Sequence, residues 1–166
     1  MENQAISQPI KQIIQFWESN NQQLTQLFNK YPDPIYAGKV APSRSSGLYL
    51  FAHLVAVSDA LFPILGLGEI KFPELARFIR ESETNINYQV DINELKAKWE
   101  AVNSKLTADF ATKDNEWWLD RHMSVSAEDF AKEPSRNKLN VLLSRASHIN
   151  YHRGQLVFLT EEVIAE

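Results

Sequence analysis

The sequence has no cysteine, and this absence removes several kinds of chemistry at once. Disulfide bonds, thiolate nucleophiles and zinc sites built on cysteine are all excluded. Any bound metal must therefore use nitrogen and oxygen ligands. The absence does not fix the compartment, although nothing in the chain requires oxidising surroundings.

Basic residues are also in short supply, because 17 Lys and Arg stand against 21 Asp and Glu and leave a formal net charge of -4. A nucleic-acid-binding domain usually shows a basic patch or a high isoelectric point. The composition thus argues against a nucleic-acid partner. The first residues, Met1-Glu2-Asn3-Gln4, are polar and acidic rather than the basic start of an export signal. We therefore expect a cytoplasmic protein.

Long apolar runs are scarce. The longest covers residues 47–66 and is interrupted by His53, Asp59 and Pro63. A membrane-spanning helix needs about 20 predominantly apolar residues. We expect a buried helix here and no membrane partner. The length of 166 residues and a hydrophobic share of 44% are typical of one globular domain, predicted to cover residues 1–166.

Glycine is rare as well, with five residues, and helical periodicity dominates. Apolar residues recur at steps of three and four in four long segments, which we predict as helices. The first covers about 6–30, the second runs from a cap at Ser43, Ser45 or Ser46 to about residue 61, and the last two cover about 91–110 and 135–163. Residues 73–79 read as a short helix with proline in its first turn. The sequence therefore predicts an all-α four-helix bundle with one or two short extra helices. The long link between the second and third helices would let the chain cross the bundle.

Histidines form the most informative pattern. His148 and His152 are four residues apart, so on a helix their side chains leave the same face one turn apart. On a helical wheel of about 100° per residue, both lie at the flank of the apolar stripe. His53 lies in the second helix among apolar residues and also points inward. Three imidazoles with a coordination position left open are typical of a catalytic or ligand-binding metal.

Spacing alone leaves alternatives open. A buried histidine is more often a core residue that is hydrogen-bonded to a neighbour, and H-x-x-x-H is a weak signal by itself. The glutamate of the zinc-peptidase motif H-E-x-x-H is missing, because Ile149 stands in its place. The Glu-x-x-His pairs of di-iron bundles are absent too. Peptidase and di-iron chemistry are therefore disfavoured.

Residues around the pair have expected roles of their own. Arg153 lies beside apolar positions and should need a carboxylate or carbonyl partner, as in a buried pair that joins helices. Gly154 would permit a close helix approach. Gln155 could hydrogen-bond a ligand imidazole or a metal-bound water, or simply pack as a polar residue.

Two further features lie outside the histidine pattern. His122 is expected in a surface loop. Trp117 and Trp118 could line a pocket mouth or a dimer contact, or be buried in the core.

Two motifs resemble those of the DinB-like (DinB/YfiT) superfamily. The run His-Ile-Asn-Tyr-His-Arg-Gly-Gln-Leu at 148–156 resembles the H-x-x-x-H-R-G-Q signature of that family's last helix. The run Leu-Phe-Ala-His-Leu-Val at 50–55 is similar to its second-helix motif. The lengths and order of the long helices match over nearly the whole chain. Many members carry a further histidine where this chain has Tyr151, but that position is not a ligand in the pattern.

The resemblance implies an up-down-down-up bundle, often dimeric, that binds one divalent metal, commonly nickel or zinc. Carried over, the metal ligands are His53, His148 and His152, with water or substrate completing the shell. Characterised members include transferases, isomerases and hydrolases that act with low-molecular-weight thiols.

The functional expectation is therefore a metal-dependent thiol S-transferase or hydrolase, with zinc, nickel or iron as the divalent ion. Its partners would be a small-molecule thiol or electrophile and a second copy of the chain. No general acid or base can be named from the sequence. The alternative is a non-enzymatic, metal-containing stress-response or binding module. A plain helical bundle with buried histidines also remains open.

Overall fold

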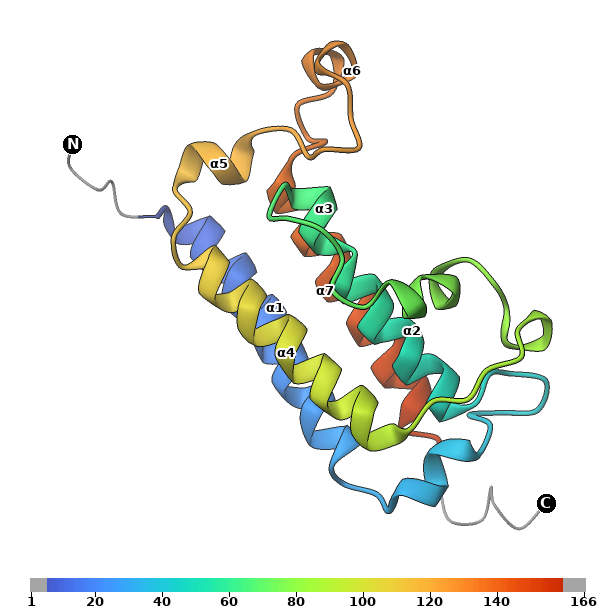
Figure 1. Cartoon of the computed structure of the whole chain (residues 1–166). Helices are drawn as coiled ribbons and strands as arrows, with labels where there is room; N and C mark the ends of the chain where they lie inside the picture. Colours follow the sequence, from blue (N-terminus) through green and yellow to red (C-terminus); the bar gives the residue numbers. More distant parts are fainter. Residues whose placement is uncertain (1–5, 160–166) are drawn as a thin grey trace.

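The computed structural model describes residues 6–159, and their regular structure is helical apart from two isolated β-bridges (Figure 1). Four long helices dominate: α1 (Gln8–Phe28), α2 (Gly47–Asp59), α4 (Ile92–Phe110) and α7 (Lys138–Leu156). Helices α1 and α7 run in one direction, and α2 and α4 run in the other (Figure 1). The chain therefore crosses from one end of the molecule to the other between α2 and α4.

Side-chain caps fix where most of the long helices begin. Ser46 Oγ accepts a hydrogen bond from a first-turn backbone N–H of α2, and the carboxylate of Asp91 accepts two in α4. Asn137 caps α7, which explains why that helix starts later than the predicted residue 135. The helix ends at Leu156, earlier than predicted, and residues 160–163 lie outside the described residues.

The connections hold more helical structure than the one or two short helices expected from the sequence. They contain three short α-helices and three 3-10 helices: α3 (Leu61–Leu65), α5 (Asn115–Leu119), α6 (Ala127–Lys132), η1 (Asp33–Ala37), η2 (Pro73–Ile79) and η3 (Glu83–Asn85). Asp114 and Ser126 each accept a backbone N–H and so cap α5 and α6. Isolated turns of this length have almost no apolar periodicity, and local capping is the main signal that could have predicted them.

The long helices bury a continuous aromatic core. Helix α7 packs mainly on α1, while α2 contacts α4, α7 and η2. Phe28 of α1 stacks on Phe51 of α2, and Trp17 and Trp118 both meet the ring of Phe110 edge-on. These five side chains are almost completely buried. Each contributes roughly 1.5–3 kcal/mol or more relative to an exposed position, so the core fixes how α1, α2 and α4 pack together.

The most apolar segment lies inside this core. Gly47–Leu65, which spans α2 and α3, has the length and composition of a membrane helix, with a mean hydropathy of 1.8. However, 72% of the hydropathy window is buried within the molecule, which is consistent with the core helix of a soluble protein. Gly47 allows η1 to approach the start of α2, because an added Cβ would lie 3.1 Å from Tyr36 O.

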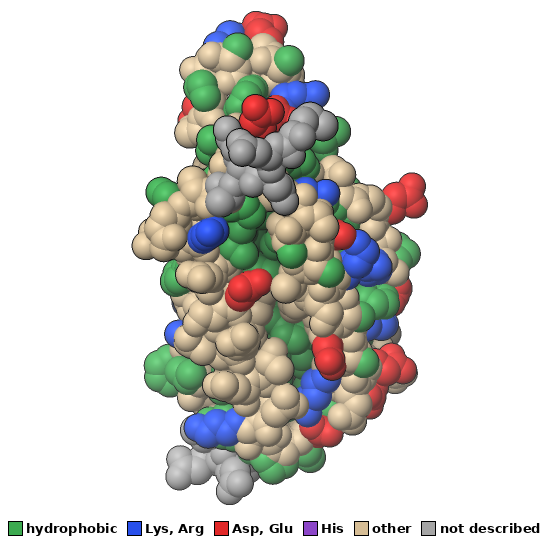
Figure 2. All heavy atoms as spheres, turned by 90° about the vertical axis from the view of Figure 1, so that its left-hand side faces the viewer, with side chains coloured by type: hydrophobic (Ala, Val, Ile, Leu, Met, Phe, Trp, Pro, Cys, Tyr) green, Lys and Arg blue, Asp and Glu red, His purple; other side chains and the backbone are tan. Residues whose placement is uncertain are grey.

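Helices α1 and α4 contact each other less than α1 contacts α7, and a groove of about 1030 Å³ runs between them. Figure 2 shows this side of the molecule, where hydrophobic side chains are visible between the two helices. Phe28, Phe51 and Trp99 belong to the lining of the groove. None of the four histidines does, so the groove is separate from the histidine cluster described below.

Hydrogen bonds tie the crossover between α2 and α4 to both ends of α2. At the start of α2, the Glu83 carboxylate accepts from Ser46 N, Ser46 Oγ and Tyr88 OH at 2.6–2.8 Å. At its end, the buried Asp59 carboxylate accepts backbone N–H groups from Lys71 and Phe72. The crossover is thereby held against α2, the helix that carries His53.

Candidate metal centre

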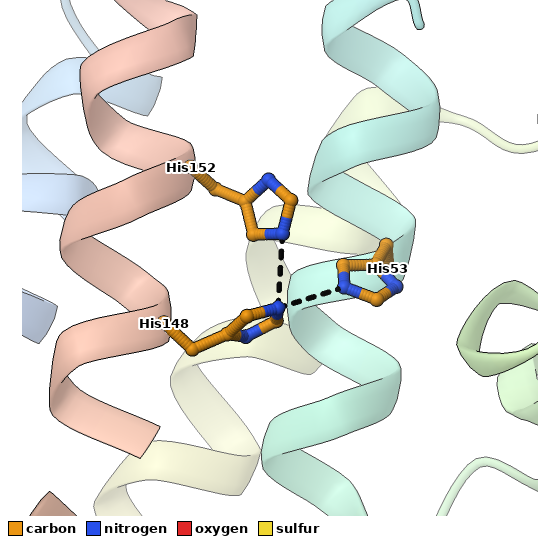
Figure 3. A group of neighbouring side chains, drawn as sticks. All are labelled: His53, His148 and His152. Carbon is orange, nitrogen blue, oxygen red and sulfur yellow. Dashed lines mark hydrogen bonds between the residues drawn. The ribbon is translucent and has the colours of Figure 1, made fainter. Parts of the chain in front are cut away.

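Three histidines from two helices converge at one point (Figure 3). His53 comes from α2, while His148 and His152 come from α7. His148 Nε2 lies 3.3 Å from His53 Nε2 and 3.0 Å from His152 Nε2. All three Nε2 atoms therefore face one small volume.

Sequence and packing together produce this convergence. The i, i+4 spacing places His148 and His152 one above the other on α7, and contact between α2 and α7 brings His53 opposite them. His152 is buried, and the other two side chains are half-buried. The cluster thus lies at the edge of the core, shielded from bulk water but not sealed.

The second ring nitrogen of two histidines is already occupied. His53 Nδ1–H donates to the carbonyl oxygen of Phe78 in η2 at 2.7 Å. His152 Nδ1–H donates to Gln155 Oε1 at 2.8 Å. Since a neutral imidazole has one N–H, both Nε2 atoms carry a lone pair directed into the cluster.

Hydrogen bonding among the rings cannot satisfy these lone pairs. His148 Nε2 can carry one proton and donate it to one neighbour, so at least one of the other two Nε2 lone pairs is left without a donor. His148 Nδ1 is buried and has no hydrogen-bond partner among the described residues. Within 3.0–3.3 Å, facing lone pairs repel, and a shared cation removes that repulsion.

The geometry fits a metal ion. With metal–nitrogen bonds of about 2.0–2.1 Å and tetrahedral angles, neighbouring ligand nitrogens lie about 3.3–3.4 Å apart. The Nε2 separations from His148 to His53 and from His148 to His152 are 3.3 and 3.0 Å, each within a few tenths of an ångström of that value. The ligand atoms of all three histidines lie within 4.8 Å of one another. The orienting bonds from His53 and His152 are those that metal-ligating histidines usually make.

Electrostatics keep the imidazoles neutral, as metal ligands must be. Burial lowers the pKa of His148 to about 3, with further lowering from His152, Arg145 and His53. Burial also lowers the pKa of His53 and of His152, although their hydrogen bonds to Phe78 and Gln155 oppose the effect. At neutral pH all three rings therefore offer lone pairs rather than charges.

Gln155 occupies the place expected of an orienting residue. Its side-chain oxygen accepts the His152 hydrogen bond, and its amide nitrogen donates to Tyr151 OH at 3.2 Å. Tyr151 itself is largely exposed. The pair of bonds fixes the amide orientation and, through it, the tautomer of His152.

Sequence reasoning missed Arg145, one turn before His148. Its Nε is buried and has no hydrogen-bond partner among the described residues, and burial lowers the pKa of the guanidinium. Its positive charge helps lower the pKa of both His53 and His148. The i, i+3 spacing to His148 was the available signal, since it places the two side chains on neighbouring parts of one helix face.

A cavity of about 380 Å³ opens beside the cluster. His53 and His152 form part of its wall, together with Gln155 and Tyr151 from α7. The remainder of the wall comes from the loop before α2, from α2 itself and from the end of η2 and the residues that follow it. The cavity therefore borders two of the three histidines, whereas His148 does not belong to its lining.

Other expectations near the cluster were wrong. Arg153 is only partly buried and makes no ion pair with any described residue, because it lies near the end of α7 over the C-terminal part of α1. Gly154 is exposed, and no heavy atom of residues 6–159 lies within 4 Å of a Cβ built on it, so none of the described helices approaches closely there.

The residues outside the cluster have ordinary environments. His122 lies in the loop between α5 and α6, and its Nδ1 accepts a weak hydrogen bond from Ser124 N. Trp118 is fully buried in the core, the third of the three roles considered for it. Trp117 is partly buried against the same core.

Comparison with known proteins agrees with the motifs. The model of the DinB family matches residues 1–163, nearly the whole chain. None of the curated proteins matches the chain significantly.

Proposed function

Because the chain belongs to the DinB family, we propose that His53, His148 and His152 hold one divalent metal ion in a site with an open position facing the adjacent cavity. The single observation that carries this proposal is the meeting of three Nε2 atoms that have too few protons to satisfy one another. Nitrogen-only ligation suits zinc, nickel or iron in the divalent state.

The proposed activity is that of a metal-dependent thiol S-transferase or hydrolase. A divalent ion at this position would act as a Lewis acid that lowers the pKa of a thiol or of water. The chain supplies three neutral donors, an acceptor on Gln155 that fixes the tautomer of His152, and a half-buried setting that limits water. The absence of cysteine is no obstacle, because the nucleophile would come from the substrate.

The cavity favours turnover over a purely structural metal site. Structural sites usually enclose the ion with four protein ligands, whereas three ligands and an open position are typical of catalysis. A volume of about 380 Å³ lies within the range of small-molecule sites.

The expected architecture and setting belong to the same proposal. The four long helices would form an up-down-down-up bundle, which is supported by α1 and α7 running opposite to α2 and α4. Homodimerisation and a cytoplasmic location stay predictions, and sedimentation equilibrium would measure the first.

Elemental analysis of protein purified without an affinity tag tests the metal site. We expect about one divalent ion per chain in the wild type, and none in the His152→Ala variant. His122→Ala is the matched control, because His122 lies outside the cluster and should leave the metal content unchanged. Equal metal content in wild type and His152→Ala would refute the assignment.

Single-turnover assays with a panel of thiols and electrophiles then test the activity. Product formation should require both the thiol and the metal, and should disappear in His152→Ala. Stoichiometric metal with no metal-dependent product across the panel would leave a metal site without the proposed chemistry.

A further inference from the structure

The cavity beside the histidines carries an excess of positive charge. Arg44, from the loop before α2, and Arg80, which follows η2, both line it. In the part of the chain that the structure describes, Glu81 is the only carboxylate in the lining, and it accepts a hydrogen bond from Arg77 Nη2 at 3.2 Å. Neither Arg44 nor Arg80 forms a side-chain hydrogen bond or ion pair with any residue from 6 to 159. A locally basic wall is notable in a chain with a net charge of -4.

The backbone that presents Arg44 is strained. Ser43, directly before it, has a φ of 58°, a left-handed conformation that costs a non-glycine residue free energy. The turn is held by Arg44 N donating to Ala41 O at 3.0 Å and by Val40 N donating to Ser45 O at 3.1 Å. Such strain persists where the surrounding structure over-determines it and is common at ligand-binding sites.

Arg80 is coupled to the histidine cluster through η2. Phe78, two residues earlier, is buried, and its carbonyl accepts the hydrogen bond from His53 Nδ1. Because η2 packs against α2, the same short helix orients a histidine and places Arg80 at the cavity. The two cationic side chains and the two cavity-facing histidines thus belong to one continuous wall.

We propose that Arg44 and Arg80 determine specificity for a substrate that bears an oxyanion, either a carboxylate or a phosphate, at a distance from the atom that meets the histidine cluster. This inference rests on the proposed function for its orientation, with the reactive end at the histidines and the anion at the arginines. Guanidinium groups bind both oxyanions through paired N–H donors, so the shared chemistry is an oxyanion with at least two acceptor oxygens.

Calorimetric binding to the metal-loaded protein tests the inference. The probes are N-acetylcysteine, which carries a carboxylate, 2-sulfanylethyl phosphate, which carries a phosphate, and N-acetylcysteine amide, which is neutral. We expect at least one anionic thiol to bind roughly tenfold more tightly than the amide, as one or two exposed charge-assisted hydrogen bonds would give. The ratio between the two anionic probes distinguishes carboxylate from phosphate.

Variants assign the preference to residues. Arg44→Gln and Arg80→Gln should each reduce the anion preference several-fold, and together abolish it, while the affinity for the amide and the metal content stay unchanged. Arg136→Gln is the matched control, because Arg136 is exposed and lies outside the cavity lining. Equal binding of anionic and neutral probes to the wild type, or a preference that survives in the double variant, would overturn the inference.

A metal-free arm separates this inference from the metal proposal. N-acetylalanine and its amide, which lack the thiol, are titrated into protein stripped with a chelator. An arginine-dependent preference for the anion there supports the inference even if the protein holds no metal. If neither the stripped nor the metal-loaded protein prefers the anion, Arg44 and Arg80 do not bind an oxyanion, whatever metal content the elemental analysis gives.

Discussion

Replacing Gln155 by leucine should weaken metal binding without touching a metal ligand. Gln155 Oε1 is the hydrogen-bond partner of His152 Nδ1–H at 2.8 Å, and the bond directs the Nε2 lone pair into the cluster. Removing such an orienting partner typically weakens metal affinity by about 10- to 100-fold, which corresponds to about 1.4–2.7 kcal/mol.

The same loss should appear in thermal unfolding. With metal in excess of the dissociation constant, the stabilisation by bound ligand falls by the lost binding free energy. For a domain of this size, about 1 kcal/mol shifts the melting temperature by about 2–4 °C, so the metal-induced increase in Tm should shrink by roughly 3–11 °C in Gln155→Leu. Differential scanning calorimetry with and without metal measures the increase directly.

Two further variants test whether the hydrogen-bond acceptor of Gln155 is responsible. Gln155→Glu keeps an acceptor for His152 and should retain most of the affinity. Tyr151→Phe removes only the hydroxyl that accepts from Gln155 Nε2 and should have a smaller effect than Gln155→Leu. A full metal-induced increase in Tm in Gln155→Leu, or an equal loss of that increase in Gln155→Glu and Gln155→Leu, would exclude this role for Gln155.

Three further predictions concern stability. The pKa of His148 is lowered to about 3 in the folded chain but is near 6.5 when unfolded, so in metal-free protein its contribution to the free energy of unfolding is complete above pH 6.5 and is lost as pH falls towards 3. Urea unfolding near pH 5 should therefore show a free energy that rises with pH less steeply in His148→Gln than in the wild type, by up to about 1.4 kcal/mol per pH unit, and identical slopes would contradict this. Gly154→Ala should stabilise the helix by about 0.5–1 kcal/mol, since an added Cβ meets nothing within 4 Å, and a lower urea midpoint would count against that placement. Asp59→Ala should cost about 1–3 kcal/mol, because the backbone N–H groups of Lys71 and Phe72 lose their acceptor; an unchanged free energy of unfolding would exclude that role.

The long helices could be predicted because their periodicity reflects burial. Residues 91–110 repeat apolar side chains on one face, and α4 occupies Ile92–Phe110. The predicted boundaries of α7 were less accurate, since an apolar stripe does not show at which residue a helix is capped or ends. The number of short helices in the connections was underestimated for a related reason, because a helix of five or six residues is too short to show an apolar stripe.

The pairing of His148 and His152 followed from their spacing, and the inward position of His53 followed from its apolar neighbours and from the resemblance. The hydrogen bonds of the three rings did not follow from the sequence. The i, i+4 rule places His148 and His152 together on any helix. The acceptor for His53 is the backbone carbonyl of Phe78, 25 positions away, in a crossover whose path no local pattern encodes.

Arg153 and Arg145 show the limit of the helical wheel. The wheel placed Arg153 on the buried side, yet it lies near the end of α7, where the neighbouring helices leave it partly open. Arg145 lies in the middle of the helix and is the more deeply enclosed of the two, with its Nε buried. A helical wheel gives only the angular position of a residue around the helix axis. Its position along the axis relative to the partner helices also decides how far it is buried.

Anomalous diffraction from crystals of the metal-loaded, untagged protein would locate the ion relative to the three histidines. We expect one anomalous peak at the meeting point of the three histidines, with the Nε2 atoms of His53, His148 and His152 at about 2.0–2.1 Å from it. A metal peak elsewhere in the molecule, or no peak among the three histidines in crystals soaked with excess metal, would show that these histidines do not form the metal site.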